Sequence, residues 1–349
     1  MHCTYAFAKL RTMKNRNDEA GFAIHALLLI SVIVLFGFVV LSRSAQQKTS
    51  APSKTSIDAP VSDSEKTLYY DGNSTGTYEI YALSADTKNS AQLTNNEQYD
   101  SWWPRISPDK SKLLFYRTPA GTHDRDYTKT ELWQLDIDNN VESMLIANGA
   151  NNWEMHGHAE WSASGNSIVM FGGSKINPQI YITDSLGNNP EKLTSEGGQN
   201  LDPSWHPNGK QIVYVGCPKS ICFPQNQEIY EITIGTKKRT RLTMDDVRDH
   251  DPYYSPDGTQ IAFLSQTSAP TDEKIVGEWD IRIYDGKVKQ LTNFRNVVSL
   301  PTWADNETIL THGFIYGSKN KFDLYEVSVP SGQVTEYLSE AEDQEYVDL

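Results

Sequence analysis

The sequence repeats about every 49 residues from Thr67 to its carboxyl end, and this repeat limits the fold more than any other feature. One recurring element is a short apolar segment led by an acidic or amide residue. Its copies are EIYAL from Glu79, ELWQL from Glu131, QIYIT from Gln179, EIYEI from Glu228, DIRIY from Asp280 and DLYEV from Asp323. A leucine-containing element such as AQLT, EKLT, TRLT or KQLT follows each copy. Six copies predict six similar structural units.

A tight turn followed by a β-branched and aromatic run forms the third element of the repeat. Its copies are WPRISPDKSKLLFY from Trp103, AEWSASGNSIVMFG from Ala159, PSWHPNGKQIVYVG from Pro203, PYYSPDGTQIAFLS from Pro252 and PTWADNETILTHG from Pro301. Ser-Pro-Asp-Gly favours a turn because Pro fixes φ and Gly tolerates a left-handed backbone. The apolar runs after it are typical of strands. Each repeat therefore supplies four short strands, and no stretch after Leu41 has a long helical period.

Small antiparallel sheets of this kind cannot bury both faces alone, so they stack radially. The predicted fold class is all-β, a six-bladed β-propeller of four-stranded blades over residues 67–349. TLYYDG from Thr67 matches the second strand of a blade. We therefore expect QEYVDL at the carboxyl end to supply the missing innermost strand and to close the ring.

The combination of PxWSPDGxxIAF, (D/E)IY and LT resembles the WD40-like β-propeller repeats of the TolB family, over residues 67–349. PYYSPDGTQIAFLS and PSWHPNGKQIVYVG are close matches, whereas EWSASGNSIVMFG lacks the Pro and Asp and PTWADNETILTHG is degenerate. The protein for which the family is named carries a small α/β domain before its propeller and is periplasmic and soluble. In this chain a hydrophobic segment and a linker occupy that place.

Residues 22–41, FAIHALLLISVIVLFGFVVL, contain no formal charge and are long enough to span a bilayer as a helix. Lys9, Arg11, Lys14 and Arg16 precede this segment, which favours a cytoplasmic amino terminus. The predicted organisation is a cytoplasmic tail (1–21), a transmembrane signal anchor (22–41), a Ser-, Ala- and Thr-rich linker (42–66) and an extracytoplasmic propeller. A cleaved signal peptide is the alternative, although its apolar region is usually shorter, about 7 to 15 residues.

The net charge and the cysteines indicate which class of partner and which cellular compartment to expect. The net charge is −14, and residues 1–66 hold eight Lys or Arg and five Asp or Glu, so the propeller carries −17. Such a body repels phosphate backbones, which argues against nucleic acid as a partner. Cys217 and Cys222 lie on the predicted exported side, where a small disulfide loop is favoured over free thiols.

Candidate site residues come from the loops that lead into the innermost strands, because these loops surround one mouth of a propeller's central channel. The candidates for binding a ligand or partner are Trp103, His156, His158, Asp202, Asp249, His250 and Asp251. Imidazoles beside carboxylates suit transition metals, which makes His156, His158, Asp202 and Asp251 candidate ligands. The alternative is structural, since an Asp before the Pro can accept hydrogen bonds from backbone N–H groups in the turn. No cofactor is otherwise expected.

No G-x-S-x-G nucleophile motif and no phosphate-binding G-x-x-x-x-G-K-(S/T) motif occurs in the sequence. The favoured function is a membrane-anchored protein-interaction or ligand-binding module of the cell envelope, without catalysis. Its expected partner is an envelope protein or a small polar ligand. The alternative is a metal-dependent lyase or hydrolase acting on carbohydrate or another polar substrate, since oligogalacturonate lyases are similar at the repeat level and use a histidine-rich channel with a metal.

Overall fold

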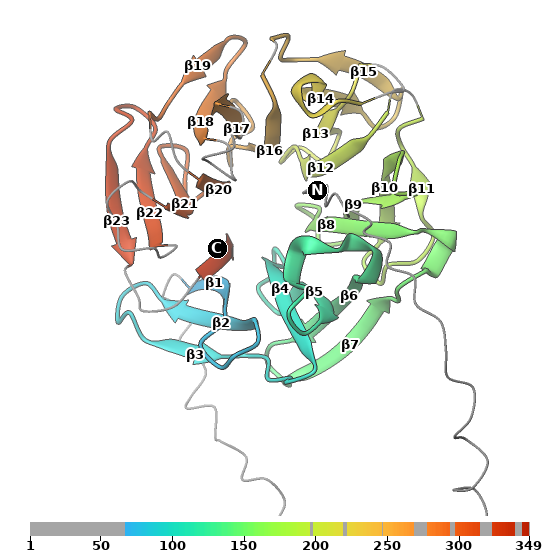
Figure 1. Cartoon of the computed structure of the whole chain (residues 1–349), viewed down its shortest axis with the longest axis vertical. Coiled ribbons are helices and arrows are strands. Elements are labelled where there is room, and N and C mark those ends of the chain that lie inside the picture. The colour runs from blue at the N-terminus through green and yellow to red at the C-terminus, as the bar shows by residue number, and fades with distance from the viewer. Residues whose placement is uncertain are drawn as a thin grey trace, which may run out of the picture. The chain divides into compact units, whose positions relative to one another are not determined.

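A computed structural model describes residues 67–348, except 196–197, 219–221, 246, 269–277, 294–296, 315–322 and 339–343. Within them the chain forms six four-stranded antiparallel sheets arranged radially around a central axis (Figure 1). This confirms the predicted all-β, six-bladed propeller. The predicted tail, membrane-spanning segment and linker lie outside the described residues. None of the helices in the described part of the chain has the length and apolar character needed to cross a bilayer.

The four strands of each blade follow one another from the axis outward. Blade 1 contains β24 (Gln344–Asp348), β1 (Thr67–Gly72), β2 (Glu79–Ser84) and β3 (Ser90–Gln92). Blade 2 contains β4 (Tyr99–Ile106), β5 (Lys112–Pro119), β6 (Glu131–Asp136) and β7 (Val141–Ile146). Blade 3 contains β8 (Met155–Trp161), β9 (Ser167–Gly173), β10 (Pro178–Asp184) and β11 (Glu191–Lys192).

The other three blades follow the same order. Blade 4 contains β12 (Asn200–Trp205), β13 (Gln211–Gly216), β14 (Glu228–Thr233) and β15 (Lys238–Arg241). Blade 5 contains β16 (Asp249–Tyr254), β17 (Ile261–Ser268), β18 (Glu278–Tyr284) and β19 (Val288–Gln290). Blade 6 contains β20 (Val297–Trp303), β21 (Thr308–Phe314), β22 (Asp323–Ser328) and β23 (Val334–Leu338).

Both ends of the described chain meet in blade 1. β24 pairs antiparallel with β1, from Tyr69 opposite Asp348 to Gly72 opposite Gln344, and Figure 1 shows the last strand beside the first. In addition, the Asp348 carboxylate accepts a hydrogen bond from the backbone N–H of Ile106 in blade 2, at 2.7 Å. The ring is therefore closed by strand pairing and by a side-chain bond to the next blade.

The acidic residue and the threonine of the repeat form one hydrogen-bonded unit inside a blade. In blade 4 the Thr243 hydroxyl donates to Glu228 Oε2 at 2.7 Å and accepts from the N–H of Ile229 at 2.9 Å. Thr94 joins Glu79 and Ile80 in the same way in blade 1, and Thr292 joins Asp280 and Ile281 in blade 5. The threonine thus satisfies a buried backbone donor and a buried carboxylate at once, which explains why both recur.

Replacing Thr243 by Val is expected to lower the free energy of unfolding by about 2 kcal/mol, because Glu228 and the Ile229 N–H then lose a buried partner. Denaturant unfolding of the full-length chain in detergent measures this loss. Thr240→Val, at an exposed position of β15, is the matched control and should change stability little. Equal losses in the two variants would contradict this role for Thr243.

The tryptophans of the turn element join neighbouring blades. Trp161 Nε1 donates to the Arg105 carbonyl at 3.2 Å, Trp205 Nε1 to the Glu160 carbonyl at 3.3 Å, and Trp303 Nε1 to the Tyr253 carbonyl at 3.0 Å. Apolar clusters fill the space between blades, as where Phe171 of blade 3 and Tyr214 of blade 4 share one core cluster. These bonds and contacts hold the innermost strands in a common register around the axis.

Candidate functional site

Four of the predicted site residues occupy equivalent positions in successive blades. Trp103, His158, Asp202 and Asp251 have left-handed backbones, with φ of 62°, 53°, 48° and 49°. The strand pairing shifts register at each of these positions. A left-handed residue in a bulge re-aims its side chain out of the normal strand alternation. We call these four residues the loop-side ring, since they lie near the loops that lead into the innermost strands.

His158 is at the centre of this ring. Its Nδ1 lies 2.8 Å from Asp202 Oδ1 and 3.9 Å from Asp251 Oδ1. The Trp103 indole stacks on its imidazole, with ring centroids 4.0 Å apart. The side chains of His158, Asp202 and Asp251 are 10%, 6% and 15% exposed, so Asp251 is the most accessible of the three.

Two further side chains hold this group in place. The Tyr127 hydroxyl lies 2.8 Å from His158 Nε2 and comes from the loop between β5 and β6, in the short helix η2 (Tyr127–Lys129). The other is His250, with Nδ1 3.0 Å from Asp202 Oδ2 and Nε2 2.9 Å from Gln227 Oε1. His158 is therefore supported by Tyr127 from a peripheral loop, and Asp202 is supported by His250, the residue before Asp251 in β16.

Burial and charge separate the pKa values of the two carboxyl groups. Although burial raises it, the pKa of Asp202 lies far below its usual range because attraction to His158 and His250 outweighs burial. Burial, together with repulsion by the charge of Asp202, raises the pKa of Asp251 to about 7. Burial also lowers the pKa of His250 to about 4, and the charge of Arg248 acts in the same direction. At neutral pH, Asp202 is ionised and His250 is neutral.

The structure places His156 and Asp249 apart from the loop-side ring. His156 is 1% exposed and lies among Tyr116 and Trp153, with ring centroids 5.7 and 6.3 Å away. Asp249 is fully buried and accepts a hydrogen bond from Ser265 Oγ at 2.7 Å. Residues two apart on a regular strand face the same side. The register shift between Gly157 and Glu160 in β8, and its counterpart in β16, breaks that rule in these two blades.

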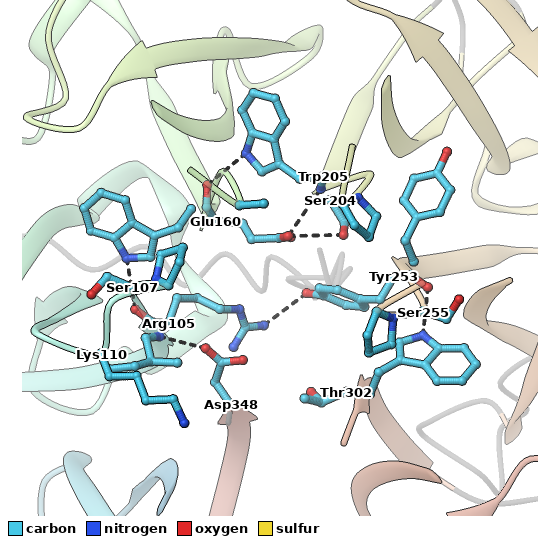
Figure 2. A pocket seen from close by; sticks show the side chains of 18 residues that line it. Arg105, Ser107, Lys110, Glu160, Ser204, Trp205, Tyr253, Ser255, Thr302 and Asp348 are labelled. Atoms are coloured by element: carbon cyan, nitrogen blue, oxygen red, sulfur yellow. Dashed lines mark hydrogen bonds between the residues drawn. The ribbon is translucent and has the colours of Figure 1, made fainter. Parts of the chain in front are cut away.

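A second ring lies two residues further along the same strands, and sequence analysis missed it. A cavity of about 360 Å³ opens on the side of the tight turns. We call its central members the turn-side ring: Arg105, Glu160, Ser204, Tyr253, Thr302 and Asp348. Figure 2 shows Arg105, Glu160, Tyr253 and Asp348 converging from different blades. In β4, β8, β12 and β16 the turn-side residue follows the loop-side residue by two positions, so a comparison of the repeats at that position would have found this second set.

The charged groups of the turn-side ring differ in how completely they are hydrogen-bonded. The Arg105 guanidinium donates to the Pro104 carbonyl at 2.7 Å and to the Tyr253 hydroxyl at 3.0 Å. Glu160 Oε1 accepts from Ser204 Oγ at 3.3 Å and from the Trp205 N–H at 3.2 Å, whereas Oε2 is buried with no hydrogen-bond partner among the described residues. Burial raises the pKa of Glu160 to about 8 against the opposing charge of Arg105.

Aromatic and proline side chains form the wall of this cavity. Its lining includes Trp161, Trp205, Tyr254, Trp303, Pro108, Pro207 and Pro256, together with Lys110 and Ala163 near the turns. These residues come from blades 2 to 6. The mouth is therefore a recessed surface of aromatic, aliphatic and charged groups on a rigid frame, which suits recognition of a ligand or a protruding segment.

Among the residues that the structure describes, two groups of side chains have the spacing needed to bind a metal ion. His158, Asp202 and Asp251 form one, and Glu228, Asp245 and Asp249 form the other, with one potential ligand atom per residue within 4.8 Å of the others. The second group already has protein partners, since Arg241 contacts Glu228 and Arg282 contacts Asp245. Only the first combines a nitrogen ligand with carboxylates.

Cys217 and Cys222 are disulfide-bonded in the structure, with Cα atoms 5.6 Å apart. They enclose part of the connection between β13 and β14, at a peripheral position comparable to the loop that carries Tyr127. Cys217 is fully buried and its carbonyl accepts a hydrogen bond from Arg239 at 3.2 Å. The disulfide is thus part of a blade and contributes no side chain to either ring.

Comparisons with known proteins give relatives by sequence and by structure, and no family model matches the chain. An uncharacterised protein of Agrobacterium fabrum is 32% identical over 128 residues, 36% of this chain and 38% of that protein. The Tol-Pal system protein TolB of Legionella pneumophila is 31% identical over 75 residues, 22% of this chain and 17% of that protein. The matches therefore span less than half the length of these relatives.

Among solved structures, TolB from Acinetobacter baumannii is similar with a TM-score of 0.62 and 17% identity, over 80% of this chain and 65% of that chain. At this identity the likeness concerns the fold, and it agrees with the six-bladed propeller described above.

Proposed function

Because the chain is a TolB-like six-bladed β-propeller with TolB relatives by sequence and structure, we propose that it is a protein-interaction module of the cell envelope. In this proposal residues 22–41 anchor it in the membrane and the propeller is extracytoplasmic. It recognises an envelope protein without catalysing a reaction. The observation that carries the proposal is the recessed, aromatic-rich mouth on the turn side of the propeller axis.

The lining of this mouth has the composition of a binding site. Tryptophan, tyrosine and arginine are enriched among the residues that dominate binding energy at protein interfaces, and the mouth combines all three. Its volume of about 360 Å³ is large enough for a few side chains of an inserted segment. The acidic surface, −17 over residues 67–349, favours a partner with a basic contact surface.

A capture experiment with mouth variants tests the proposal. The full-length chain, immobilised in detergent, is mixed with solubilised envelope proteins, and the bound proteins are identified by mass spectrometry. Ala163→Arg and Pro256→Arg place a bulky charge at the mouth and should abolish capture of the partner. Val141→Arg, at a 53% exposed position on outer strand β7, is the control and should retain it. Capture that is equal in all four proteins would overturn a role for the mouth.

The location is tested separately. The chain should stay in the membrane pellet after alkaline carbonate extraction, and protease should digest the propeller only when it can reach the outer side of the cytoplasmic membrane. Release of the chain by carbonate would contradict the anchor. Digestion only after the inner membrane is broken would contradict the orientation.

A further inference from the structure

Three ligand-type side chains from three different blades converge in the loop-side ring. We propose that His158, Asp202 and Asp251 form a binding site for a divalent transition-metal ion of the Zn²⁺ or Mn²⁺ class. One imidazole nitrogen with two carboxylates is a ligand set that such ions accept. Blades 3, 4 and 5 supply one ligand each, from equivalent left-handed positions. These three residues precede the turn-side ring by two positions on the same strands and are not among the residues that line the mouth, so the site does not depend on the proposed partner.

The distances between the ligand atoms fit a shared ion. Atoms bound to one metal at about 2.1 Å lie roughly 3 to 3.5 Å from one another in tetrahedral or octahedral geometry. His158 Nδ1 lies 2.8 Å from Asp202 Oδ1 and 3.9 Å from Asp251 Oδ1, which brackets this range. Moreover, His158 Nδ1 is buried, and the contacts from both carboxylates fall on this one ring nitrogen.

The second ring nitrogen of His158 also has a partner. Its Nε2 is 2.8 Å from the Tyr127 hydroxyl, so when an ion replaces the contact between Nδ1 and Asp202, the ring N–H on Nε2 can donate to Tyr127. A partner on the second ring nitrogen is the usual way in which proteins orient a metal-binding histidine. Stacking of Trp103 on the imidazole fixes its plane.

The carboxylates are also placed for binding. Asp202 Oδ2 contacts His250 Nδ1 at 3.0 Å, which leaves Oδ1 as the atom facing His158. Asp251 is 15% exposed, which gives an ion and its water ligands a route of access. Three protein ligands leave at least one position for water or for a ligand atom. The other candidate group, Glu228, Asp245 and Asp249, is occupied by Arg241, Arg282 and Ser265.

Metal binding to the full-length chain, purified without a histidine tag and stripped with a chelator, tests this proposal. After equilibrium dialysis against micromolar Zn²⁺ or Mn²⁺, elemental mass spectrometry should find one equivalent per chain. Asp251→Asn and His158→Ala should each weaken binding at least tenfold. Tyr127→Phe should weaken it about tenfold, because it removes the hydroxyl that orients His158. Asp245→Asn, in the other acidic group, is the matched control and should bind like the parent.

Substituting Co²⁺ adds a spectroscopic readout, since visible absorption typical of nitrogen and oxygen ligands should appear in the parent and be lost in Asp251→Asn. Near-ultraviolet circular dichroism checks that each variant is folded. If His158→Ala does not fold, Asp251→Asn decides, because its side chain is the most accessible of the three. Absence of a stoichiometric ion from the parent, or retention of the ion in Asp251→Asn, overturns the proposal.

Discussion

Removal of residues 344–349 is expected to abolish the folded propeller, because it deletes the innermost strand of blade 1. β1 then loses its ladder with β24, and Ile106 loses the Asp348 carboxylate that accepts its N–H. Each net backbone hydrogen bond contributes about 1 kcal/mol, and loss of several of them together with ring closure approaches the 5 to 15 kcal/mol stability of a typical domain. Near-ultraviolet circular dichroism and thermal unfolding in detergent measure the result.

A chain that ends at Asp348 is the matched control for this truncation, because it keeps β24 whole. It should unfold cooperatively at the parent temperature, whereas the chain that ends at residue 343 should show no cooperative transition. The same melting temperature for both chains would show that closure by β24 is dispensable.

Replacing Glu160 by Gln is expected to remove a pH dependence of stability. The pKa of this buried carboxyl is raised to about 8 in the folded protein, against 4.5 for an ordinary glutamate. Between these values the folded state binds more protons than the unfolded state, so rising pH destabilises the parent. At 1.36 kcal/mol per pKa unit, this group lowers the free energy of unfolding by up to about 5 kcal/mol between pH 4.5 and 8. Glu160→Gln should therefore gain stability relative to the parent as pH rises.

Denaturant unfolding at pH 5, 6, 7, 8 and 9 measures this difference. Asp249 and Asp251 also have pKa values raised to about 7, so the parent and the variant keep a shared pH dependence that cancels in the comparison. Glu191→Gln, at a 63% exposed side chain, is the control and should follow the parent. A constant difference between Glu160→Gln and the parent across this range would mean that Glu160 is ionised throughout.

The repeat made most of the fold predictable. Its acidic residue and threonine mark the hydrogen-bonded unit of each blade, as in Glu228 and Thr243, and its tryptophan marks the bond to the neighbouring blade. The residues of the hydrogen-bonded unit and the tryptophan recur at nearly fixed spacing, so both features can be recognised from the sequence. The residues before Thr67 contain no such repeat, and their predicted membrane segment stays a prediction.

The site was only partly predictable, and the reasons are physical. Comparing equivalent positions of the repeat singled out His158, Asp202 and Asp251, which do lie together. The same comparison included His156 and Asp249, because no sequence pattern signals that a register shift turns alternate residues of a strand in different directions. Tyr127 comes from an insertion outside the repeat, so nothing periodic marked it.

Site-specific photo-crosslinking in living cells measures most directly whether the turn-side mouth binds an envelope protein. A photoreactive residue replaces Ala163 at the mouth or Val141 on the outer edge of blade 2 in the full-length chain. The predicted result is a discrete adduct with one envelope protein from position 163, absent from position 141 and lost when Pro256→Arg obstructs the mouth. Adducts that are the same from both positions, or no adduct from position 163, would contradict binding at the mouth.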